Sequence, residues 1–209
     1  MKFVAVSQRV DLVSDRKEYR DALDHNIARF LLTCGFISVP VPNIFQDTVL
    51  EDFLNPFMKK LKPHALVLSG GNSLGESREK DETELAMISY AEQKGLPLLG
   101  ICRGMQMMAY RAGINPVRRT GHAGIRHQIN GEISGSVNSY HDFCILDCPK
   151  DYEVTSECDQ KTIESIKHRK LPWEGWMWHP EREPIFDKRD VERLTALFNS
   201  CGPTGAFQD

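Results

Sequence analysis

Short apolar runs alternate with longer segments of helical periodicity through the first half of the chain. The apolar runs cover 2–7, 36–41, 65–68 and 96–101, and the helical segments cover 19–34, 50–61 and 81–93. Apolar strands joined by helices indicate a parallel sheet that is covered on both faces. The sequence therefore predicts an α/β fold for this half, with its first helix ending at Gly35.

The pattern changes after Gly113 to shorter strand-like pieces separated by turn residues. These pieces cover 125–129, 136–139, 143–146, 152–156, 163–168 and 175–178. They predict antiparallel strands added to one edge of the sheet, before a last helix over 188–199. A length of 209 residues suits one domain and leaves no room for a second, synthase-type domain. We expect that domain over 1–201 and a loose tail over 202–209.

The net charge and the length of the apolar runs exclude two classes of partner. Hydrophobic residues make up 41% of the chain and charged residues 26%, with a formal net charge of −3, as in an ordinary globular protein. A general nucleic-acid binder needs a large positive field, which this chain lacks. No apolar run approaches the roughly 20 residues of a membrane span. We therefore expect neither nucleic acid nor a membrane as a partner.

Six cysteines are spread along a chain that is large enough to fold without disulfides. The residues from Met1 onward enter a strand pattern directly, so we expect no signal peptide and a cytoplasmic protein with reduced thiols. Cys144 and Cys148 have the spacing of a metal pair, but no second close Cys/His pair completes a tetrahedral set. Buried structural thiols are the better interpretation, and we expect no metal site.

One cysteine stands between an apolar strand and a helical segment. Gly100 and Gly104 lie two residues before and two after Cys102. Glycine permits the sharp turn of a nucleophile elbow, and the N-terminus of the following helix favours the thiolate, which is the species that attacks. The Arg103 side chain either adds positive charge there or points to solvent. Cys102 taken alone could equally be a buried thiol.

Two further segments favour catalysis. Residues 67–73 end a strand in paired glycines, and neighbouring parallel strands share a crevice at their carboxyl ends. A backbone N–H of this turn and that of Arg103 could form an oxyanion hole. Glu181 lies two residues after His179, so its carboxylate can orient an imidazole that takes the proton from Cys102. An ordinary glycine loop and a surface His-Pro-Glu are the alternatives.

These motifs together resemble the class I glutamine amidotransferase superfamily, and within it the γ-glutamyl hydrolase or γ-glutamyl-γ-aminobutyrate hydrolase branch. The resemblance runs from the first strand to the last helix. It is densest at 81–85, 100–106, 137–141 and 179–181. It implies a three-layer, mostly parallel α/β sheet with helices on both faces and extra antiparallel strands in the second half.

The resemblance also implies the catalytic residues. Cys102, His179 and Glu181 would form the triad, with the backbone amides of Gly71 and Arg103 as oxyanion donors. The implied reaction is attack of the cysteine on a γ-glutamyl amide, followed by hydrolysis of a thioester and release of glutamate. This chemistry requires no cofactor.

Further residues match positions where the family binds the α-amino and α-carboxylate ends of a glutamyl group. They are Gln106, Ser139, Tyr140 and His141. His141 follows an apolar strand and could equally be a packing histidine. By the resemblance, the partner of the protein is a small-molecule γ-glutamyl substrate.

Specificity within this branch must come from the leaving group. Residues 118–127 hold five basic or imidazole side chains and no acid, a local positive patch that suits a phosphate or diphosphate. The candidate contacts are Arg118, Arg119, Arg126 and His127. A solvated loop with scattered charge explains the same residues equally well.

Three N-terminal segments resemble a subgroup of short members that hydrolyse γ-glutamyl-CDP-amidate. The segments are 6–11, 20–24 and 39–43. The subgroup releases glutamate and cytidine diphosphoramidate for capsule polysaccharide phosphoramidate synthesis, and a diphosphate would fit the positive patch.

The leading hypothesis is a stand-alone γ-glutamyl amide hydrolase. Its rivals are a glutaminase subunit that delivers ammonia to a separate synthase, a γ-glutamyl-γ-aminobutyrate hydrolase, and a non-catalytic binding protein. The intact Cys102, His179 and Glu181 weigh against the last of these. The sequence does not decide between a monomer and a homodimer.

Overall fold

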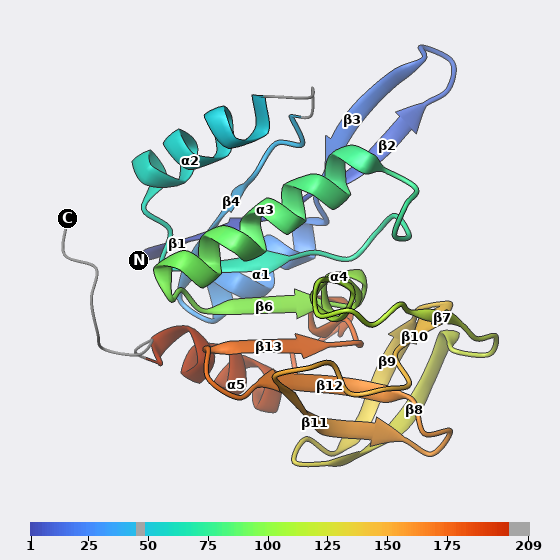
Figure 1. The fold of residues 1–209 in the computed structure, drawn as a ribbon. Helices are drawn as coiled ribbons and strands as arrows, with labels where there is room; N and C mark the ends of the chain where they lie inside the picture. The colour runs from blue at the N-terminus through green and yellow to red at the C-terminus, as the bar shows by residue number, and fades with distance from the viewer. Residues whose placement is uncertain (45–48, 201–209) are drawn as a thin grey trace.

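A nine-stranded mixed sheet organises the part of the chain that the computed structural model describes, residues 1–44 and 49–200 (Figure 1). The parallel strands are β1 (Lys2–Val6), β4 (Phe36–Pro40), β5 (Ala65–Leu68), β6 (Leu98–Ile101) and β13 (Trp173–Trp176). The antiparallel strands are β8 (Ala123–Gly131), β9 (Gly135–Tyr140), β11 (Tyr152–Cys158) and β12 (Ile163–His168). The order across the sheet is β4-β1-β5-β6-β13-β12-β11-β8-β9. The predicted fold class, a mostly parallel α/β sheet with antiparallel strands at one edge, is confirmed.

Helices cover both faces of this sheet, as predicted. One face packs against α1 (His25–Thr33) and α5 (Lys188–Asn199), and the other against α2 (Val49–Leu61), α3 (Arg78–Lys94) and α4 (Arg103–Arg111). Val4 and Val6 belong to the first core, whereas Ala5 between them belongs to the second. Because successive strand residues point to opposite faces, each central strand contributes to both cores.

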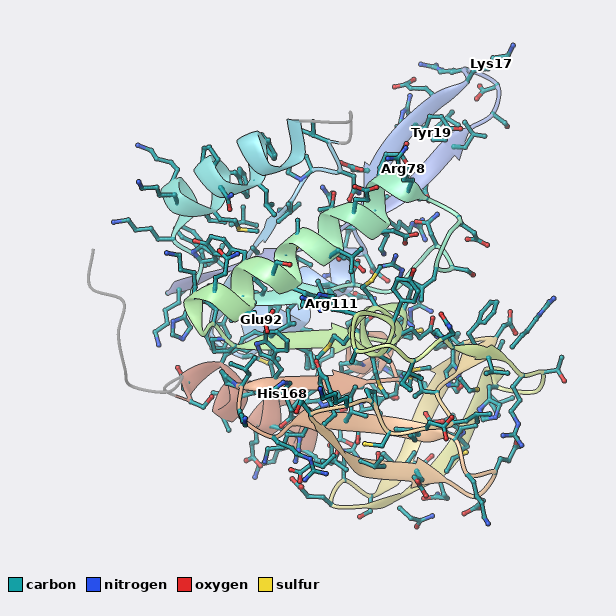
Figure 2. The ribbon with its side chains drawn as sticks, viewed as in Figure 1. Lys17, Tyr19, Arg78, Glu92, Arg111 and His168 are labelled. Carbon is teal, nitrogen blue, oxygen red and sulfur yellow. The ribbon has the colours of Figure 1, made fainter. Side chains whose placement is uncertain are left out.

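A hairpin replaces the beginning of the first predicted helix. The hairpin pairs β2 (Arg9–Val13) with β3 (Glu18–Ala22), and α1 begins only at His25, with Asp24 as its N-cap. The prediction of a helix from residue 19 was wrong because β3 is almost wholly exposed and its local sequence carries no core-facing periodicity. Figure 2 shows Lys17 and Tyr19 on this hairpin, where it projects beyond the sheet.

Helices α3 and α4 lie side by side on the second face. Glu92 on α3 and Arg111 on α4 form an ion pair of 3.6 Å between them (Figure 2). The side chain of Ser77 caps α3 at its start, and Gly95 ends it in the left-handed conformation with φ 61°. Both caps satisfy backbone groups that a helix end leaves without partners.

The strand β13, which comes last in the chain, lies in the middle of the sheet and not at its antiparallel edge. The segment 175–178 was expected among the antiparallel strands, but β13 runs parallel to β6 and pairs Trp176 with Ile101. Shorter elements complete the fold: β7 (Val117–Arg118) pairs with β10 (Phe143–Cys144), and η1 is a single turn (Pro180–Arg182). The predicted loose tail over 202–209 lies outside the described residues.

Among the helices of the described residues, none combines the length and the hydropathy that crossing a bilayer would take.

Candidate active site

Cys102 occupies a strained turn between β6 and α4. Its backbone has φ 51° and ψ −107°, a region that residues with a side chain rarely adopt. A Cβ on Gly100 would lie 2.7 Å from the backbone carbon of Gly104, and one on Gly104 would overlap the carbonyl of Leu68. The two glycines therefore let α4 begin directly over β5 and β6, which is the close approach that a nucleophile elbow needs.

The pairing of β13 with β6 brings His179 to this turn from far along the chain. The N–H of Cys102 donates to the carbonyl of Trp176 at 2.7 Å, three residues before His179. His179 is buried, and its Nδ1 lies 2.6 Å from Oε1 of the equally buried Glu181. Pro180 begins the turn η1 between them, so the local backbone folds the carboxylate back onto the imidazole.

The ionisation of His179 suits proton transfer. Burial lowers the pKa of this imidazole, but the Cys102 sulfur and the Glu181 carboxylate raise it by more than burial lowers it. The resulting pKa is about 9. The ring is therefore protonated at neutral pH and can give a proton to a departing nitrogen. A carboxylate on the other ring nitrogen holds the tautomer and stabilises the imidazolium.

A cavity of about 280 Å³ joins most of the residues that the sequence nominated. Its lining includes Cys102, His179, Gly71, Arg103, Gln106, Tyr140 and His141. Glu181 lies behind the imidazole and lines a smaller cavity of about 150 Å³ on its other side. Ser139 is not in the lining of either cavity: it is fully buried, and its hydroxyl has no hydrogen-bond partner among the described residues.

The two nominated oxyanion donors line the same cavity as the thiol. Arg103 is the first residue of α4, so its N–H has no acceptor within the helix. Gly71 has φ 99°, and a Cβ there would lie 2.7 Å from the Cβ of Arg9. A Cβ on the preceding Gly70 would lie 2.7 Å from Cε1 of His179. Paired glycines therefore let this turn pack against the imidazole.

The side chain of Arg103 points neither at solvent nor at the thiol. It is buried and forms ion pairs with Asp81 and Glu84 of α3. Burial lowers the pKa of this guanidinium to about 10, and Asp81 opposes the change. Arg103 is therefore charged at neutral pH, and it anchors the start of α4 to α3.

A buried lysine supports the glycine turn from the same helix. Lys80 Nζ donates to the carbonyl of Gly70 at 2.6 Å and lies 3.7 Å from Oε1 of Glu84. The same carboxylate oxygen accepts from the hydroxyl of Ser7 at 2.6 Å. The network connects β1, the glycine turn and α3 directly beneath the catalytic residues.

Several residues of the site were missed from sequence. Asn138 holds the backbone of His179, and Arg182 lines the cavity with its guanidinium 4.6 Å over the ring of Tyr140. Asn138 and Glu84 lie within segments where the family resemblance is densest, which is a signal that they do more than fill space. Arg182 carries no such signal.

The four candidate leaving-group contacts divide into two pairs. Arg126 is bound by Glu183 at 2.7 and 2.9 Å, and His127 Nε2 lies 3.4 Å from the buried Glu164. These contacts turn both side chains away from the catalytic cavity. None of the four candidates lines that cavity, but Arg118 and Arg119 are joined to it through the backbone, because they pair with the lining residues Phe143 and Asp142. The contacts are the register Phe143↔Arg118 and a 2.8 Å hydrogen bond from the Arg119 N–H to Asp142.

A larger cavity, of about 580 Å³, adjoins the catalytic one. Gln106 and Phe143 line both of them, and Gln106 Nε2 donates to the carbonyl of Phe143 at 3.0 Å across the boundary. The lining of the larger cavity also includes Asn115 and Pro116, which lie three and two positions before Arg118 in the sequence. The two cavities together offer space for one group at the thiol and for a second group beyond Gln106.

Comparison with known proteins finds relatives in sequence and in fold. The chain is 35% identical over 127 residues to the γ-glutamyl-CDP-amidate hydrolase of Campylobacter jejuni, a match that covers 57% of this chain and 62% of that protein. This chain therefore spans less than two thirds of that relative's length. It is 29% identical over 174 residues to anthranilate synthase component 2 of Thermococcus kodakarensis, covering 78% of this chain and 83% of the relative.

The fold is shared with a solved structure from Thermoplasma acidophilum, described as a putative GMP synthase subunit. The TM-score is 0.69 at 20% identity, over 95% of this chain and 94% of the other. The family model "Glutamine amidotransferase class-I" matches residues 17–193. Members of this family are cysteine-dependent amide hydrolases or glutaminases. The chain belongs to the class I glutamine amidotransferase family.

Proposed function

We propose that this protein hydrolyses γ-glutamyl amides through a thioester on Cys102. The observation that carries the proposal is that a strained cysteine and a carboxylate-bound imidazole line one cavity, although 77 positions separate them in the sequence. Strained backbone and shifted pKa values are typical of catalytic sites. A structural thiol at position 102 would explain neither the unfavourable backbone of Cys102 nor the raised pKa of His179.

The first half-reaction transfers the glutamyl group to the enzyme. The Cys102 sulfur attacks the γ-carbonyl carbon, and the N–H groups of Gly71 and Arg103 stabilise the oxyanion that forms. As the carbon–nitrogen bond breaks, protonated His179 gives its proton to the departing nitrogen. The products are a γ-glutamyl thioester and a free amine or amidate.

The second half-reaction releases glutamate. The imidazole of His179, now neutral, takes a proton from water, and the resulting hydroxide attacks the thioester carbon. The carbon–sulfur bond breaks, and the sulfur leaves as the thiolate beside the reformed imidazolium. Gln106 and Tyr140 line the cavity around the nucleophile, where they can bind the α-amino and α-carboxylate groups. His141 lines it too, but its ring nitrogens face the carbonyl of Phe143 and the carboxylate of Glu164.

We further propose γ-glutamyl-CDP-amidate as the substrate, in the supply of phosphoramidate for a capsule polysaccharide. Its hydrolysis would free glutamate and cytidine diphosphoramidate. The 35% identity to a γ-glutamyl-CDP-amidate hydrolase supports this choice. The adjoining cavity supports it too, because it gives the leaving group a place beyond Gln106 with Arg118 and Arg119 next to its wall.

A glutaminase subunit is the second candidate. The similarity to anthranilate synthase component 2, and the fold shared with a protein described as a GMP synthase subunit, favour it. In that role the released nitrogen would be ammonia, passed to a synthase on another chain. A γ-glutamyl-γ-aminobutyrate hydrolase and a non-catalytic binder are the remaining alternatives.

A substrate screen on the purified chain separates these functions. The substrates are γ-glutamyl-CDP-amidate, γ-glutamyl-γ-aminobutyrate and glutamine, with glutamate release as the measurement. Rapid cleavage of the first by the chain alone supports the proposal, whereas glutamine turnover that rises on adding a synthase supports the subunit. The Cys102→Ala variant should lose all turnover and stay folded, while Cys148→Ala, which changes an exposed cysteine, should behave as the wild type. Wild-type turnover by Cys102→Ala would refute the mechanism.

A further inference from the structure

Six side chains of metal-ligating types meet among the antiparallel strands, and one of them, His141, also lines the catalytic cavity. We call them the histidine cluster: His122, His127, His141, Cys144, Cys158 and Glu164. They come from the loop before β8, from β8, β10, β11 and β12, and from the residue that follows β9. All are buried except His127, which is partly buried. From sequence, Cys144 was paired with its neighbour Cys148 and set aside, but Cys148 is exposed and the potential partners come from other strands.

The side chains of the cluster are close enough to share an ion. Ligand atoms of His122, His127, Cys158 and Glu164 all lie within 4.8 Å of one another. Those of His122, His141 and Cys144 do so as well, so His122 belongs to both groups. Donors around tetrahedral zinc lie about 2.0–2.3 Å from the ion, which places them about 3.5 Å from one another. The longest distances between ligand atoms of the four-residue group would therefore shorten by roughly 1 Å on binding.

The hydrogen bonds of two histidines leave lone pairs directed at the centre of the cluster. His122 Nε2 lies 3.1 Å from Gln160 Oε1, and His141 Nδ1 lies 3.1 Å from the carbonyl of Phe143. Both partners are acceptors, so each of these nitrogens donates, and the opposite nitrogen of the neutral ring has the lone pair that a metal needs. A metal-ligating histidine is oriented in this way by an acceptor on its other nitrogen.

The atoms that face inward have nothing to bind. His122 Nδ1, His127 Nε2, His141 Nε2 and Glu164 Oε2 have no hydrogen-bond partner within the described ranges 1–44 and 49–200. Glu164 Oε2 lies 3.4 Å from His127 Nε2 and 3.7 Å from His141 Nε2. Each buried polar group without a hydrogen-bond partner costs about 1–3 kcal/mol. A cation shared by these atoms would satisfy them.

We propose that His122, His127, Cys158 and Glu164 bind a Zn²⁺-type transition-metal ion. Two imidazoles, a thiolate and a carboxylate are ligands typical of zinc, whereas magnesium and calcium take oxygen ligands. Binding deprotonates Cys158, whose Sγ lies 2.8 Å from the hydroxyl of Thr162, and the proton goes to solvent. Thr162 donates its one hydroxyl hydrogen to Glu164 Oε1 at 2.8 Å, so it orients that ligand.

The ion has a structural role next to the catalytic cavity. It connects the loop before β8 to β8, β11 and β12, and Glu164 connects it to His141, which lines that cavity. The segment from Tyr140 to Phe143 would then be held from behind by the metal. No step of the proposed hydrolysis passes through the ion, so this site stands or falls independently of the proposed function.

Cobalt titration of the purified, chelator-treated protein tests the site. We expect one equivalent of Co²⁺ to bind with the visible spectrum of a tetrahedral complex and a thiolate charge-transfer band, and Zn²⁺ to displace it. Cys158→Ser should lose the charge-transfer band. His122→Ala should weaken binding by at least about a hundredfold, since partners outside the ligand set alone change metal affinity by about 10- to 100-fold. Zn²⁺ should also raise the Tm of the wild type but not that of His122→Ala.

Two sets of variants make the result specific. His25→Gln and Cys148→Ser change an exposed histidine and an exposed cysteine outside the cluster and should bind as the wild type does. Cys102→Ser removes the catalytic thiol and should also bind normally. A spectrum that is lost in Cys102→Ser but kept in Cys158→Ser would overturn the proposal, because the metal would then occupy the catalytic site. Absence of stoichiometric binding by the folded wild type would overturn it as well, leaving a protonated imidazole as the partner of Glu164.

Discussion

Asn138 holds the backbone of His179 through two hydrogen bonds. Its Nδ2 donates to the carbonyl of His179 at 2.8 Å, and its Oδ1 accepts from the N–H of the same residue at 2.9 Å. The two residues are 41 positions apart and both are buried. Asn138 therefore fixes the backbone from which the imidazole projects, whereas Glu181 fixes the ring.

Replacing Asn138 with alanine should impair catalysis more than substrate binding. Both hydrogen bonds are lost, and a misplacement of a catalytic group by about 1 Å costs about a hundredfold in rate. We expect kcat to fall by about 10- to 100-fold with KM little changed, measured by glutamate release. Asn130→Ala, which changes an exposed asparagine on β8, should leave both constants unchanged. Equal kinetics in the two variants would show that Asn138 does not position the imidazole.

The raised pKa of His179 sets the alkaline limit of activity. Its pKa is about 9, so we expect kcat/KM to decline as the pH rises through about 9 and the proton donor is lost. Glu181→Gln removes a carboxylate that raises this pKa. The alkaline limb should then move to lower pH and kcat should fall by about 10³- to 10⁴-fold. Titration of the ring by NMR gives the same pKa directly, and an unmoved value in Glu181→Gln would contradict the assignment.

The same imidazole makes the fold sensitive to pH. The folded-state pKa of about 9 lies above the roughly 6.5 of histidine in an unfolded chain. The protonated ring therefore stabilises the fold fully below about pH 6.5, and this contribution is lost as the pH rises through 9. In His179→Gln the decrease in Tm between these pH values should be smaller than in the wild type. An equal decrease in both proteins would place the pH sensitivity elsewhere.

Lys80 should contribute more to stability than its position on a helix suggests. Lys80→Met leaves the carbonyl of Gly70 without its donor. Because burial and the Arg103 guanidinium lower the pKa of Lys80, we count the loss as that of a buried hydrogen bond, and the free energy of unfolding in urea should fall by about 1–3 kcal/mol. Lys94→Met, on the exposed end of the same helix, should change it by less than about 0.5 kcal/mol. Similar losses in the two variants would mean that the network does not stabilise the fold.

Sequence periodicity was sufficient for most of the fold. The strands β1, β4, β5 and β6 were predicted because they are short apolar runs, of which β5 and β6 are wholly buried, and α2 and α5 because their apolar residues recur at helical spacing. The β2–β3 hairpin was missed because it is stabilised by pairing within itself and projects from the sheet, so its sequence carries no burial pattern. The parallel position of β13 depends on which strand the chain returns to, and local sequence does not encode that choice.

Parts of the site depend on contacts that no local pattern contains. Cys102 and the His179–Glu181 pair were nominated because each belongs to a short motif with its own chemistry. The inward direction of Arg103 follows from acids on α3, and the histidine cluster is assembled from strands that are distant in sequence. His127 illustrates the difficulty: its neighbours in sequence indicate a basic patch, but its neighbours in space are Glu164 and two other histidines.

The arginines of segment 118–127 should differ in their effect on KM according to their position in the structure. Arg118 and Arg119 adjoin the cavities, whereas Arg126 is already bound by Glu183 and by the carbonyl of Ser136. In Arg118→Gln/Arg119→Gln we expect KM for γ-glutamyl-CDP-amidate to rise by about tenfold or more, since a charge-assisted hydrogen bond contributes about 1.5–3 kcal/mol. KM for glutamine, which carries no phosphate, should not change.

Arg126→Gln is the matched control for this double variant, because it removes the same charge from the same segment. It should leave KM for both substrates within about twofold of the wild type, and it should lower Tm slightly through loss of the exposed pair with Glu183. If the double variant raised KM for glutamine as much as for the diphosphate conjugate, the arginines would act on the glutamyl half or on the fold. If Arg126→Gln alone raised KM for the conjugate, its ion pair with Glu183 would have to open to admit the substrate. The two substrates and the two variants therefore locate the leaving group without requiring a bound structure.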